Sequence, residues 1–331
     1  MVRIFVTFPP HARKNYYPDK ALAGLRALGD VAVNSLDRPL VTSELSAAAQ
    51  GFDFIVSDRE TPGDGELFRS LPGLVAFLRC AVDIRNIDVA AASECAILVT
   101  QASAGFMTSV AEWILGVMID SSRGISASVV AYRGGERPVP AMGRELKGST
   151  LGVVGYGNIG RHLCDMALAL GMNVVFADPV RTADDRRLRR TNFEELLREA
   201  DYVVCLAPAL AETENMFGAR AFAQMKPTAF FINAARGNLV DESALERALD
   251  DGRIAGCALD VGRAPDQMPS PRLARHPKVV ATPHIGGLTP QSTEHQALET
   301  VAQLGTILAG GIPRGAVNAE HATRLARLSN R

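Results

Sequence analysis

The sequence has 331 residues, a formal net charge of −1, and 47% hydrophobic against 21% charged residues. This length suggests about two domains, and the composition is typical of a folded globular protein rather than a disordered chain. Because Lys and Arg (35 together) nearly balance Asp and Glu (36 together), the chain offers no basic surface for nucleic acid and no polybasic patch for a membrane.

The sequence predicts neither a membrane-spanning helix nor a signal peptide. The sequence has no run of about 18 or more apolar residues, which a membrane-spanning helix requires. The apolar stretch Met1–Thr7 ends before Pro9 and Pro10, so it is typical of a first β-strand rather than a signal peptide. The five cysteines form no CxxC pair. We therefore expect free thiols in a reducing cytoplasm, with neither a disulfide framework nor a metal site.

Short apolar runs alternate with helical patterns along most of the chain, which is typical of parallel sheets covered by helices. In the first third, the predicted strands are Arg3–Thr7, Asp53–Ser57, Leu74–Leu78 and Ile97–Thr100. A helix is predicted at Asp19–Leu28. A longer helix is predicted at Ser109–Tyr132, where apolar residues recur on one stripe.

The middle of the chain predicts six further strands with helices between them, enough for a complete doubly wound sheet. These strands are Leu151–Val154, Asn173–Ala177, Tyr202–Ala207, Ala229–Ile232, Ala255–Leu259 and Val279–Ala281. A last long helix is predicted at Pro290–Leu308. The predicted fold class is therefore α/β, with two doubly wound parallel-sheet domains. We expect residues 102–286 to form one domain, inserted into a discontinuous domain of residues 1–101 and 287–331.

A GxGxxG motif begins directly after a predicted strand and opens a helical pattern. In that context each glycine has a physical role. Gly155 allows a tight turn, Gly157 lets the backbone approach a pyrophosphate, and Gly160 lets helix and strand pack closely. The first N–H groups of the helix, at Asn158 and Ile159, and the helix dipole favour a bound anion.

The next predicted strand ends in Asp178, 18 residues after Gly160. A carboxylate at this place accepts hydrogen bonds from a ribose hydroxyl and repels a 2′-phosphate, so the sequence favours NAD over NADP. Arg181 lies close enough in the sequence to leave NADP open. These features together predict a Rossmann domain that binds a dinucleotide.

Polar residues also follow three other predicted strands: Arg236, Asp260 and His284. Ligands of open α/β sheets bind beyond the carboxyl ends of the strands, so we expect these side chains at one site. A guanidinium grips a carboxylate and polarises a neighbouring carbonyl, and an imidazole exchanges a proton while hydride moves. Asp260 is expected to hold either the nicotinamide amide or a neighbouring loop. A hydride-transfer enzyme that acts on a 2-hydroxy or 2-oxo acid needs groups of these kinds.

Five stretches carry a resemblance to one known family. They are Leu151–Gly160, Asn233–Glu242, Leu259–Val261, Thr282–Gly287 and the closing pair at 317–318. On these motifs the chain resembles, over nearly its whole length, the D-isomer-specific 2-hydroxyacid dehydrogenases, which include glyoxylate/hydroxypyruvate reductases and phosphoglycerate dehydrogenases. The resemblance implies a Rossmann NAD domain inserted into a flavodoxin-like substrate domain. It also implies a homodimer built around the Ser109–Tyr132 helix.

The resemblance assigns roles to residues as well. It implies Arg236 as the arginine that binds the substrate carboxylate and His284 as the acid/base. The cofactor-binding residues, including those of the glycine motif, are then Gly155, Gly157, Asn158, Ile159, Gly160, Asp178, Pro208, Ala234, Arg236, Asp260, His284 and Gly286. The substrate-binding residues are Ala81, Val82, Phe106 and Arg236.

The chain departs from the family at the catalytic glutamate. In the family this residue follows the Leu-Asp-Val strand and pairs with the histidine, which stabilises the protonated imidazole and fixes its tautomer. Pro265 stands five residues after Asp260, where the family has that glutamate. Either the neighbouring Asp266 supplies the catalytic carboxylate from a reshaped loop, or His284 works without a carboxylate partner.

Two more departures concern the substrate pocket. The family usually has a glycine-rich turn whose N–H groups hold the substrate carboxylate, but here the turn Cys80–Asn86 lacks glycine and contains Asp83. Arg79 or Arg85 either contributes a positive charge there or is simply exposed. At 106–107 an apolar Phe-Met pair stands where many relatives carry a polar residue. This pair either faces an acid bulkier or less polar than glyoxylate, or packs into the core between the domains.

The leading hypothesis is an NAD-dependent dehydrogenase that transfers hydride between the nicotinamide and a 2-hydroxy or 2-oxo acid. Two alternatives stay open. A non-enzymatic NAD-sensing protein on the same scaffold is compatible with the missing glutamate. A dehydrogenase of a non-hydroxyacid substrate, such as formate or phosphite, shares the scaffold, although formate enzymes carry glutamine where this chain has Pro265.

Overall fold

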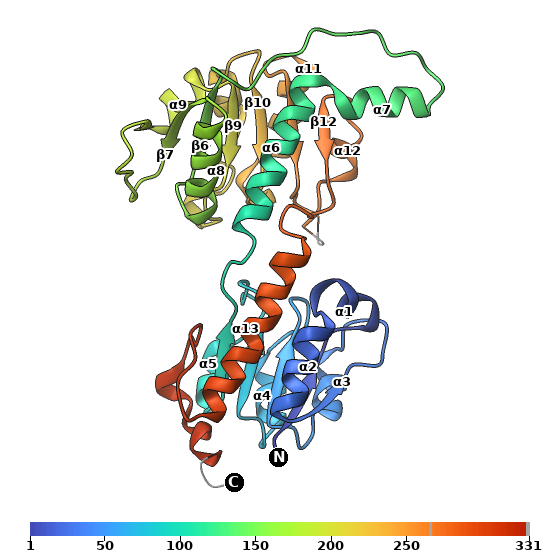
Figure 1. Ribbon diagram of the computed structural model, residues 1–331, viewed down its shortest axis with the longest axis vertical. Helices are drawn as coiled ribbons and strands as arrows, with labels where there is room; N and C mark the ends of the chain where they lie inside the picture. The colour runs from blue at the N-terminus through green and yellow to red at the C-terminus, as the bar shows by residue number, and fades with distance from the viewer. Residues whose placement is uncertain (265–266, 329–331) are drawn as a thin grey trace. The chain divides into compact units, whose positions relative to one another are not determined.

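The computed structural model describes residues 1–264 and 267–328, and the chain divides into two compact units (Figure 1). Unit 1 comprises Met1–Phe106 and Thr289–Arg331, and unit 2 comprises Met107–Leu288. The chain thus leaves unit 1 once, forms unit 2 and returns, which makes unit 1 discontinuous. The two crossings lie slightly later in the sequence than the expected borders at 101 and 286.

Unit 1 is built on a five-stranded sheet in the order β2-β1-β3-β4-β5, in which all neighbours are parallel. The strands are β1 (Arg3–Val6), β2 (Asp30–Val33), β3 (Phe54–Ser57), β4 (Ala76–Arg79) and β5 (Leu98–Gln101). This strand order is that of flavodoxin-like folds. All residues of β3 and β4 are buried, as expected for parallel strands that are covered on both faces.

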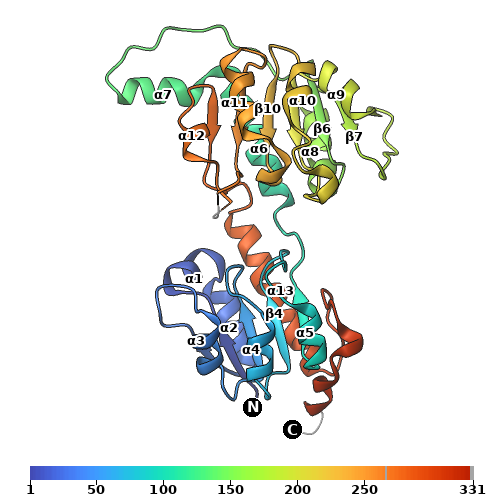
Figure 2. The same ribbon diagram turned by 180° about the vertical axis from the view of Figure 1, so that it is seen from behind.

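Helices from both ends of the chain cover this sheet (Figures 1 and 2). They are α1 (Pro10–Tyr16), α2 (Asp19–Leu28), α3 (Thr42–Ala48), α4 (Gly65–Ser70), α5 (Val89–Glu94) and α13 (Pro290–Leu308), with the 3₁₀ turns η3 (Ala319–His321) and η4 (Thr323–Arg327). α2 and α13 pack against each other. Leu22 and Leu25 of α2 share one hydrophobic core with Leu304 of α13. The C-terminal segment therefore completes the fold of the N-terminal one.

Unit 2 is built on a seven-stranded parallel sheet in the order β12-β11-β10-β9-β6-β7-β8. The strands are β6 (Thr150–Val154), β7 (Asn173–Ala177), β8 (Leu188–Arg190), β9 (Tyr202–Cys205), β10 (Phe230–Asn233), β11 (Gly256–Leu259) and β12 (Val279–Ala281). Because β6 pairs with both β7 and β9, the strand order reverses at β6. Open α/β sheets bind ligands at such a switch point.

The helices of unit 2 lie on both faces of this sheet (Figures 1 and 2). They are α6 (Met107–Arg123), α7 (Ile125–Arg133), α8 (Asn158–Ala169), α9 (Phe193–Glu199), α10 (Ala219–Gln224), α11 (Glu242–Asp250) and α12 (Pro271–Ala274), with the 3₁₀ turns η1 (Ala211–Thr213) and η2 (Gly237–Leu239). The two parallel sheets confirm the predicted α/β fold class.

The sequence pattern misses two strands, and both are edge strands. β2 begins with the exposed Asp30 and buries no residue fully. In β8 only Leu188 is buried, while Arg189 and Arg190 are exposed. Edge strands have one side open to water and tolerate charged side chains. Neither segment therefore carries the apolar run by which the buried strands are predicted.

The single helix expected at Ser109–Tyr132 is two helices, because Gly124 interrupts it. Gly124 adopts a left-handed conformation (φ 63°), which glycine reaches at little cost. α7 then runs in a direction 67° away from α6. α6 buries much of one face in unit 2, whereas no residue of α7 is buried. Figures 1 and 2 show α7 projecting beyond the sheet of unit 2.

Among the described residues, no single helix is long and apolar enough to cross a membrane. The bent pair of α6 and α7 reaches that length and composition only when the two helices are taken together.

The cysteine side chains differ in their exposure to solvent, which thiol reactivity can measure. Cys80, Cys164, Cys205 and Cys257 are buried, and Cys95 is partly exposed. Burial raises the pKa of the Cys164 thiol and of the Cys205 thiol to about 12 each. Because the thiolate is the reactive form, buried thiols that stay protonated react slowly.

We therefore expect one fast thiol per chain, Cys95, when the native protein is labelled with Ellman's reagent at about pH 8. The remaining four thiols should react only in denaturant, and Cys95→Ser should abolish the fast phase. Two or more fast thiols in the native protein would contradict this arrangement.

Candidate active site

The glycine motif forms a tightly packed turn between β6 and α8. Gly155 has φ 102°, and a side chain there would place its Cβ 2.6 Å from the Leu206 carbonyl group that follows β9. A Cβ at Gly160 would lie 2.3 Å from the Gly155 carbonyl oxygen. Both positions therefore exclude any side chain, as the motif predicts. The turn sits at the switch point of the sheet, where β6 and β9 are neighbours.

Gly157 differs from the other two glycines because the space around it is open. A Cβ at Gly157 would meet no atom within 4 Å. This open space lies at the N-terminus of α8, whose first N–H groups have no carbonyl partner within the helix. The helix dipole adds partial positive charge at the same place. A pyrophosphate group fits these features, so the turn is suited to a dinucleotide.

Asp178, at the end of β7, joins the glycine turn to its own loop. One carboxylate oxygen accepts the N–H of Tyr156 at 2.8 Å, and the other accepts those of Val180 and Arg181 at 2.9 and 2.8 Å. Burial opposes ionisation of this carboxyl, but the three hydrogen bonds outweigh burial and lower its pKa. Asp178 thus remains negatively charged beside the turn, where the sequence predicts the ribose contact.

Arg236 lies in the turn that follows β10. The buried Asn233 side chain shapes this turn: its Oδ1 accepts the N–H of Ala235 at 3.0 Å, and its Nδ2 donates to the Arg236 carbonyl at 3.0 Å. The Arg236 guanidinium donates to the Ala235 carbonyl at 2.7 Å. The guanidinium is therefore attached to a turn whose backbone is fixed from within the strand.

Asp260 holds the loop that carries His284. Its buried carboxylate accepts hydrogen bonds from Thr282 Oγ1 (2.6 Å), Ile285 N (2.8 Å) and Gly286 N (2.7 Å). Asp260 was expected to hold either the nicotinamide amide or a neighbouring loop, and these bonds are to a neighbouring loop. Between these anchors His284 has a positive φ of 56°, which is uncommon for a residue other than glycine. The Asp260 bonds offset the cost of this conformation.

The ends of β10, β11 and β12 are adjacent in the sheet. Arg236 and His284 thus follow two strands that flank β11, the strand that ends at Asp260. Because parallel neighbours lie about 4.8 Å apart, β10 and β12 are separated by roughly 10 Å. The two residues therefore share one edge of one sheet with the glycine turn.

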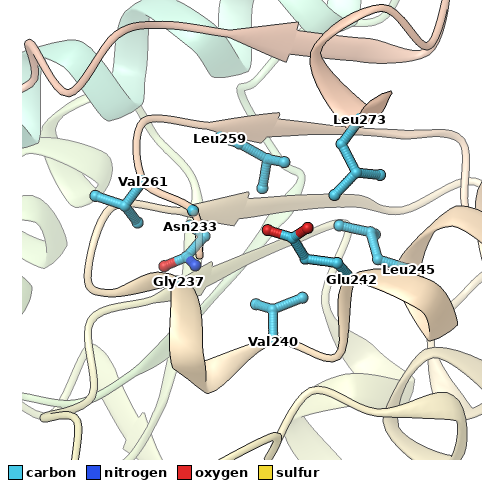
Figure 3. A pocket seen from close by; sticks show the side chains of 9 residues that line it. Asn233, Gly237, Val240, Glu242, Leu245, Leu259, Val261 and Leu273 are labelled. Carbon is cyan, nitrogen blue, oxygen red and sulfur yellow. The ribbon is translucent and has the colours of Figure 1, made fainter. Parts of the chain in front are cut away.

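A small cavity of about 10 Å³ lies under the Arg236 turn, between β10, β11 and α11 (Figure 3). Its apolar lining is Val240, Leu245, Leu259, Val261 and Leu273. The Glu242 side chain points into it, as Figure 3 shows, and Glu242 Oε1 accepts the N–H of Arg263 at 3.2 Å. A space of this size holds one water at most. It is part of the packing beneath the site and no substrate pocket.

The predicted substrate residues Ala81, Val82 and Phe106 belong to unit 1. Ala81 is buried and its carbonyl accepts the N–H of Ala102 at 3.0 Å, whereas Val82 is 38% exposed. Next in this turn, Asp83 is paired with Arg85, whose Nη2 lies 2.6 Å from Asp83 Oδ2. The negative charge that distinguishes this turn is therefore balanced within the turn itself.

Arg79 is neither exposed nor available to a substrate, which excludes the role considered for it. It is fully buried, and its guanidinium donates to the carbonyl oxygens of Asp58 and Thr61 and to Asn86 Oδ1. Burial lowers its pKa to about 10. Arg79 thus ties the loop after β3 to the loop after β4.

The remaining predicted residues of the site are distributed as follows. Pro208 follows β9 and is exposed, Ala234 follows β10 and is partly exposed, and the Gly286 N–H is bound by Asp260. Pro265 and Asp266 lie outside the described residues, so the catalytic role of Asp266 stays a prediction. Asn233 has a structural role that no sequence motif predicts. A buried asparagine at the end of an apolar strand is the signal that would have indicated its role in the Arg236 turn.

Comparison with protein families finds a match in the middle of the chain. The model described as "D-isomer specific 2-hydroxyacid dehydrogenase, NAD binding domain" matches residues 115–286. This range covers the glycine turn, Arg236 and His284.

Curated relatives extend the similarity beyond that domain. The chain is 37% identical over 264 residues to an (S)-sulfolactate dehydrogenase of Chromohalobacter salexigens, covering 78% of this chain and 85% of the relative. It is 30% identical over 314 residues to a glyoxylate reductase of Thermococcus gammatolerans, covering 92% and 94%. It is 32% identical over 323 residues to a D-3-phosphoglycerate dehydrogenase of Methanocaldococcus jannaschii, covering 96% of this chain but only 60% of that relative's length.

Solved structures share the architecture. A protein of Thermus thermophilus matches with a TM-score of 0.84 at 31% identity, covering 96% of this chain and all (100%) of the other. A D-isomer specific 2-hydroxyacid dehydrogenase of Lactobacillus delbrueckii, solved in its NAD-complexed form, matches with a TM-score of 0.80 at 26% identity, covering 96% and 100%.

The role of Asp260 can be tested by Asp260→Asn. The amide nitrogen replaces one acceptor oxygen and faces donors, so the loop loses a charge-assisted hydrogen bond. We expect the free energy of unfolding, measured in urea, to fall by about 2–3 kcal/mol. Asp251→Asn is the matched control, because Asp251 is exposed and its replacement should change stability little. Equal stability of the two variants would show that the Asp260 carboxylate does not hold the loop.

Proposed function

The chain belongs to the D-isomer-specific 2-hydroxyacid dehydrogenase family, and we propose that it transfers a hydride between NAD and a 2-hydroxy or 2-oxo acid. The single observation that carries this proposal is that three features lie on the same edge of the unit 2 sheet, the edge at the carboxyl ends of its strands. The open glycine turn after β6, Arg236 after β10 and His284 after β12 all leave the sheet on that edge. The relatives named as glyoxylate reductase and (S)-sulfolactate dehydrogenase support the same class of substrate.

We propose that Arg236 binds the substrate. Its guanidinium presents parallel N–H donors that match a carboxylate, and the positive charge polarises the adjacent 2-oxo group. The turn around Arg236 is fixed by Asn233, so little conformational freedom is lost when the substrate binds. Bound NADH supplies the hydride for reduction, and NAD accepts it in the reverse direction.

His284 is the proposed acid/base. During reduction its ring donates a proton to the carbonyl oxygen as C2 receives the hydride, and during oxidation it accepts the proton of the hydroxyl group. The ring projects from a loop that Asp260 anchors on both sides. Pre-set geometry of this kind accounts for much of the rate enhancement when a proton and a hydride move together.

NAD is the proposed cofactor in preference to NADP. The ionised Asp178 beside the glycine turn supports this choice, because a second negative charge on the ribose would be repelled. Among the solved relatives, one was obtained in its NAD-complexed form and another in complex with NADPH, so the proposed preference rests on Asp178. We also propose a cytoplasmic location, since the five cysteines are free and free thiols persist in a reducing compartment.

The role of Arg236 is tested by Arg236→Ala. We expect kcat/KM for a 2-oxo acid to fall by about a hundredfold or more, because the variant loses fixed charge on the reacting group. Arg236→Lys keeps the charge but loses the fork of donors, so its kcat/KM should lie between those of Arg236→Ala and the wild type. The assay is the decrease in NADH absorbance.

Arg272→Ala is the matched control, because Arg272 lies in the same unit and pairs with Glu246 at 2.7 Å with its side chain 61% exposed. It should retain wild-type kcat/KM. Undiminished turnover in Arg236→Ala would contradict the proposed substrate contact.

We further propose a homodimer in which a second copy of the chain covers α7. Helices of fewer than about 12 residues are marginal in water without packing, and α7 buries none of its 9 residues. Large apolar side chains on it and on the segment that follows are exposed: Ile125 (48%), Val129 (40%), Val130 (69%), Tyr132 (67%), Val139 (87%) and Met142 (100%). Exposed apolar surface of this extent indicates an interface.

The dimer is tested by sedimentation equilibrium at micromolar concentration. The wild type should sediment as a dimer, and Val130→Asp should shift it to monomer, since a charge would be buried at the interface. Val41→Asp changes a comparably exposed valine (56%) in unit 1 and should leave the dimer intact. A monomeric wild type would refute the proposal.

A further inference from the structure

The turn that carries Arg236 has a second support outside its own strand. That support is Arg263, which lies in the loop after β11, three residues beyond Asp260. Arg263 Nε donates to the Val240 carbonyl at 3.0 Å, and Nη2 donates to the Asn238 carbonyl at 2.9 Å. Both carbonyl groups belong to the chain directly after Arg236, at η2. One guanidinium thus holds the turn through carbonyl groups that Asn233 does not contact.

The same guanidinium also reaches the segment after η1. Nη2 lies 2.7 Å from Glu214 Oε1 and 2.5 Å from Asn215 Oδ1. Glu214 in turn accepts a bond from Asn238 Nδ2 at 2.8 Å. The hydrogen bonds from Arg263 and Asn238 lower the pKa of Glu214, so its carboxylate opposes the positive charge of Arg263. Three loops of the carboxyl edge therefore meet at Arg263.

The Arg236 turn after β10 and the loop after β11 are packed so closely that their backbones cannot slide past each other. A Cβ on Gly237 would lie 2.1 Å from the carbonyl group of Gly262, and a Cβ on Gly262 would lie 2.4 Å from the Met268 carbonyl oxygen. The Arg236 turn therefore rests directly on the Gly262 backbone, next to Arg263. Movement of one turn requires movement of the other.

From these contacts we infer that Arg263 is a positioning residue, which holds the Arg236 turn in the geometry that binds the substrate carboxylate. This inference rests on the proposed function, because it takes Arg236 as the substrate-binding group. A lysine cannot replace Arg263 fully, since one ammonium group does not reach two carbonyls and a carboxylate with the planar geometry of a guanidinium.

The test compares Arg263→Ala and Arg263→Lys with the wild type and with Arg272→Ala. In Arg263→Ala, KM for the 2-oxo acid should rise between about tenfold and a hundredfold, because a small misplacement of a binding group has effects of that size. The dissociation constant of NADH, measured by fluorescence, should change less than about twofold. The KM of Arg263→Lys should lie between those of Arg263→Ala and the wild type, and the KM of Arg272→Ala should equal that of the wild type.

Amide hydrogen exchange gives a readout independent of activity. The amides of Leu239 and Val240 donate to carbonyl groups within the turn, and the amide of Asp241 donates to the Phe217 carbonyl beside it. In Arg263→Ala these three amides should exchange faster than in the wild type and in Arg272→Ala. Arg263→Lys should retain part of the protection that Arg263→Ala loses.

The outcomes separate the inference from the proposed function. An active wild type together with unchanged KM and unchanged exchange in Arg263→Ala would overturn the inference alone. A wild type without turnover, combined with faster exchange at residues 239–241 in Arg263→Ala, would support the positioning role and refute the proposed function. A rise in KM matched by an equal rise in the dissociation constant of NADH would also overturn the inference, because it would indicate general disruption of unit 2.

Discussion

Parallel pairing of the unit 2 strands is the constraint on which the proposed site depends. It places the carboxyl ends of β6, β9, β10, β11 and β12 on one edge of one sheet. Residues separated by more than a hundred positions in the sequence, such as Gly157 and His284, thereby leave the sheet on the same side. The reversal of strand order at β6 adds open space for a ligand at that edge. The chemistry then depends on which side chains follow each strand.

Side chains with oxygen acceptors give the loops of this edge their shapes. Asp178, Asn233 and Asp260 each accept backbone N–H groups of a turn that cannot satisfy those donors itself. A buried N–H without a partner is costly, so each acceptor selects one loop conformation. Close packing of glycine backbones, at Gly155 and Gly237, removes the remaining freedom. In unit 1 a buried arginine, Arg79, has the converse role, because it donates to loop carbonyls.

The sequence predicted the buried parts of the fold well, since apolar runs and the helical repeat are local signals. The bounds of α2 and α13 agree with the predicted ranges, and the GxGxxG motif marks the turn in which Gly155 and Gly160 exclude side chains. β2 and β8 were missed because edge strands lack an apolar run. The break at Gly124 was missed because a glycine inside an apolar stripe does not by itself indicate a left-handed residue.

The proposed site could be predicted only in part. Arg236, Asp260 and His284 were found because each follows a strand, which is a sequence feature. Their supports were not found, because Asn233 and Arg263 act through backbone atoms of distant loops, and such contacts depend on the strand order. Arg79 was misjudged for the same reason: its burial follows from the loops after β3 and β4, which meet only in the folded unit.

Steady-state turnover of the wild-type protein is the decisive measurement for the proposed hydride transfer. The purified protein would be assayed with NADH and with NADPH against 2-oxo acids of graded size, and with NAD against formate and phosphite. The proposed function requires oxidation of NADH by at least one 2-oxo acid, with a higher kcat/KM for NADH than for NADPH. Tight NADH binding without turnover of any 2-oxo acid, or turnover of formate or phosphite alone, would contradict it.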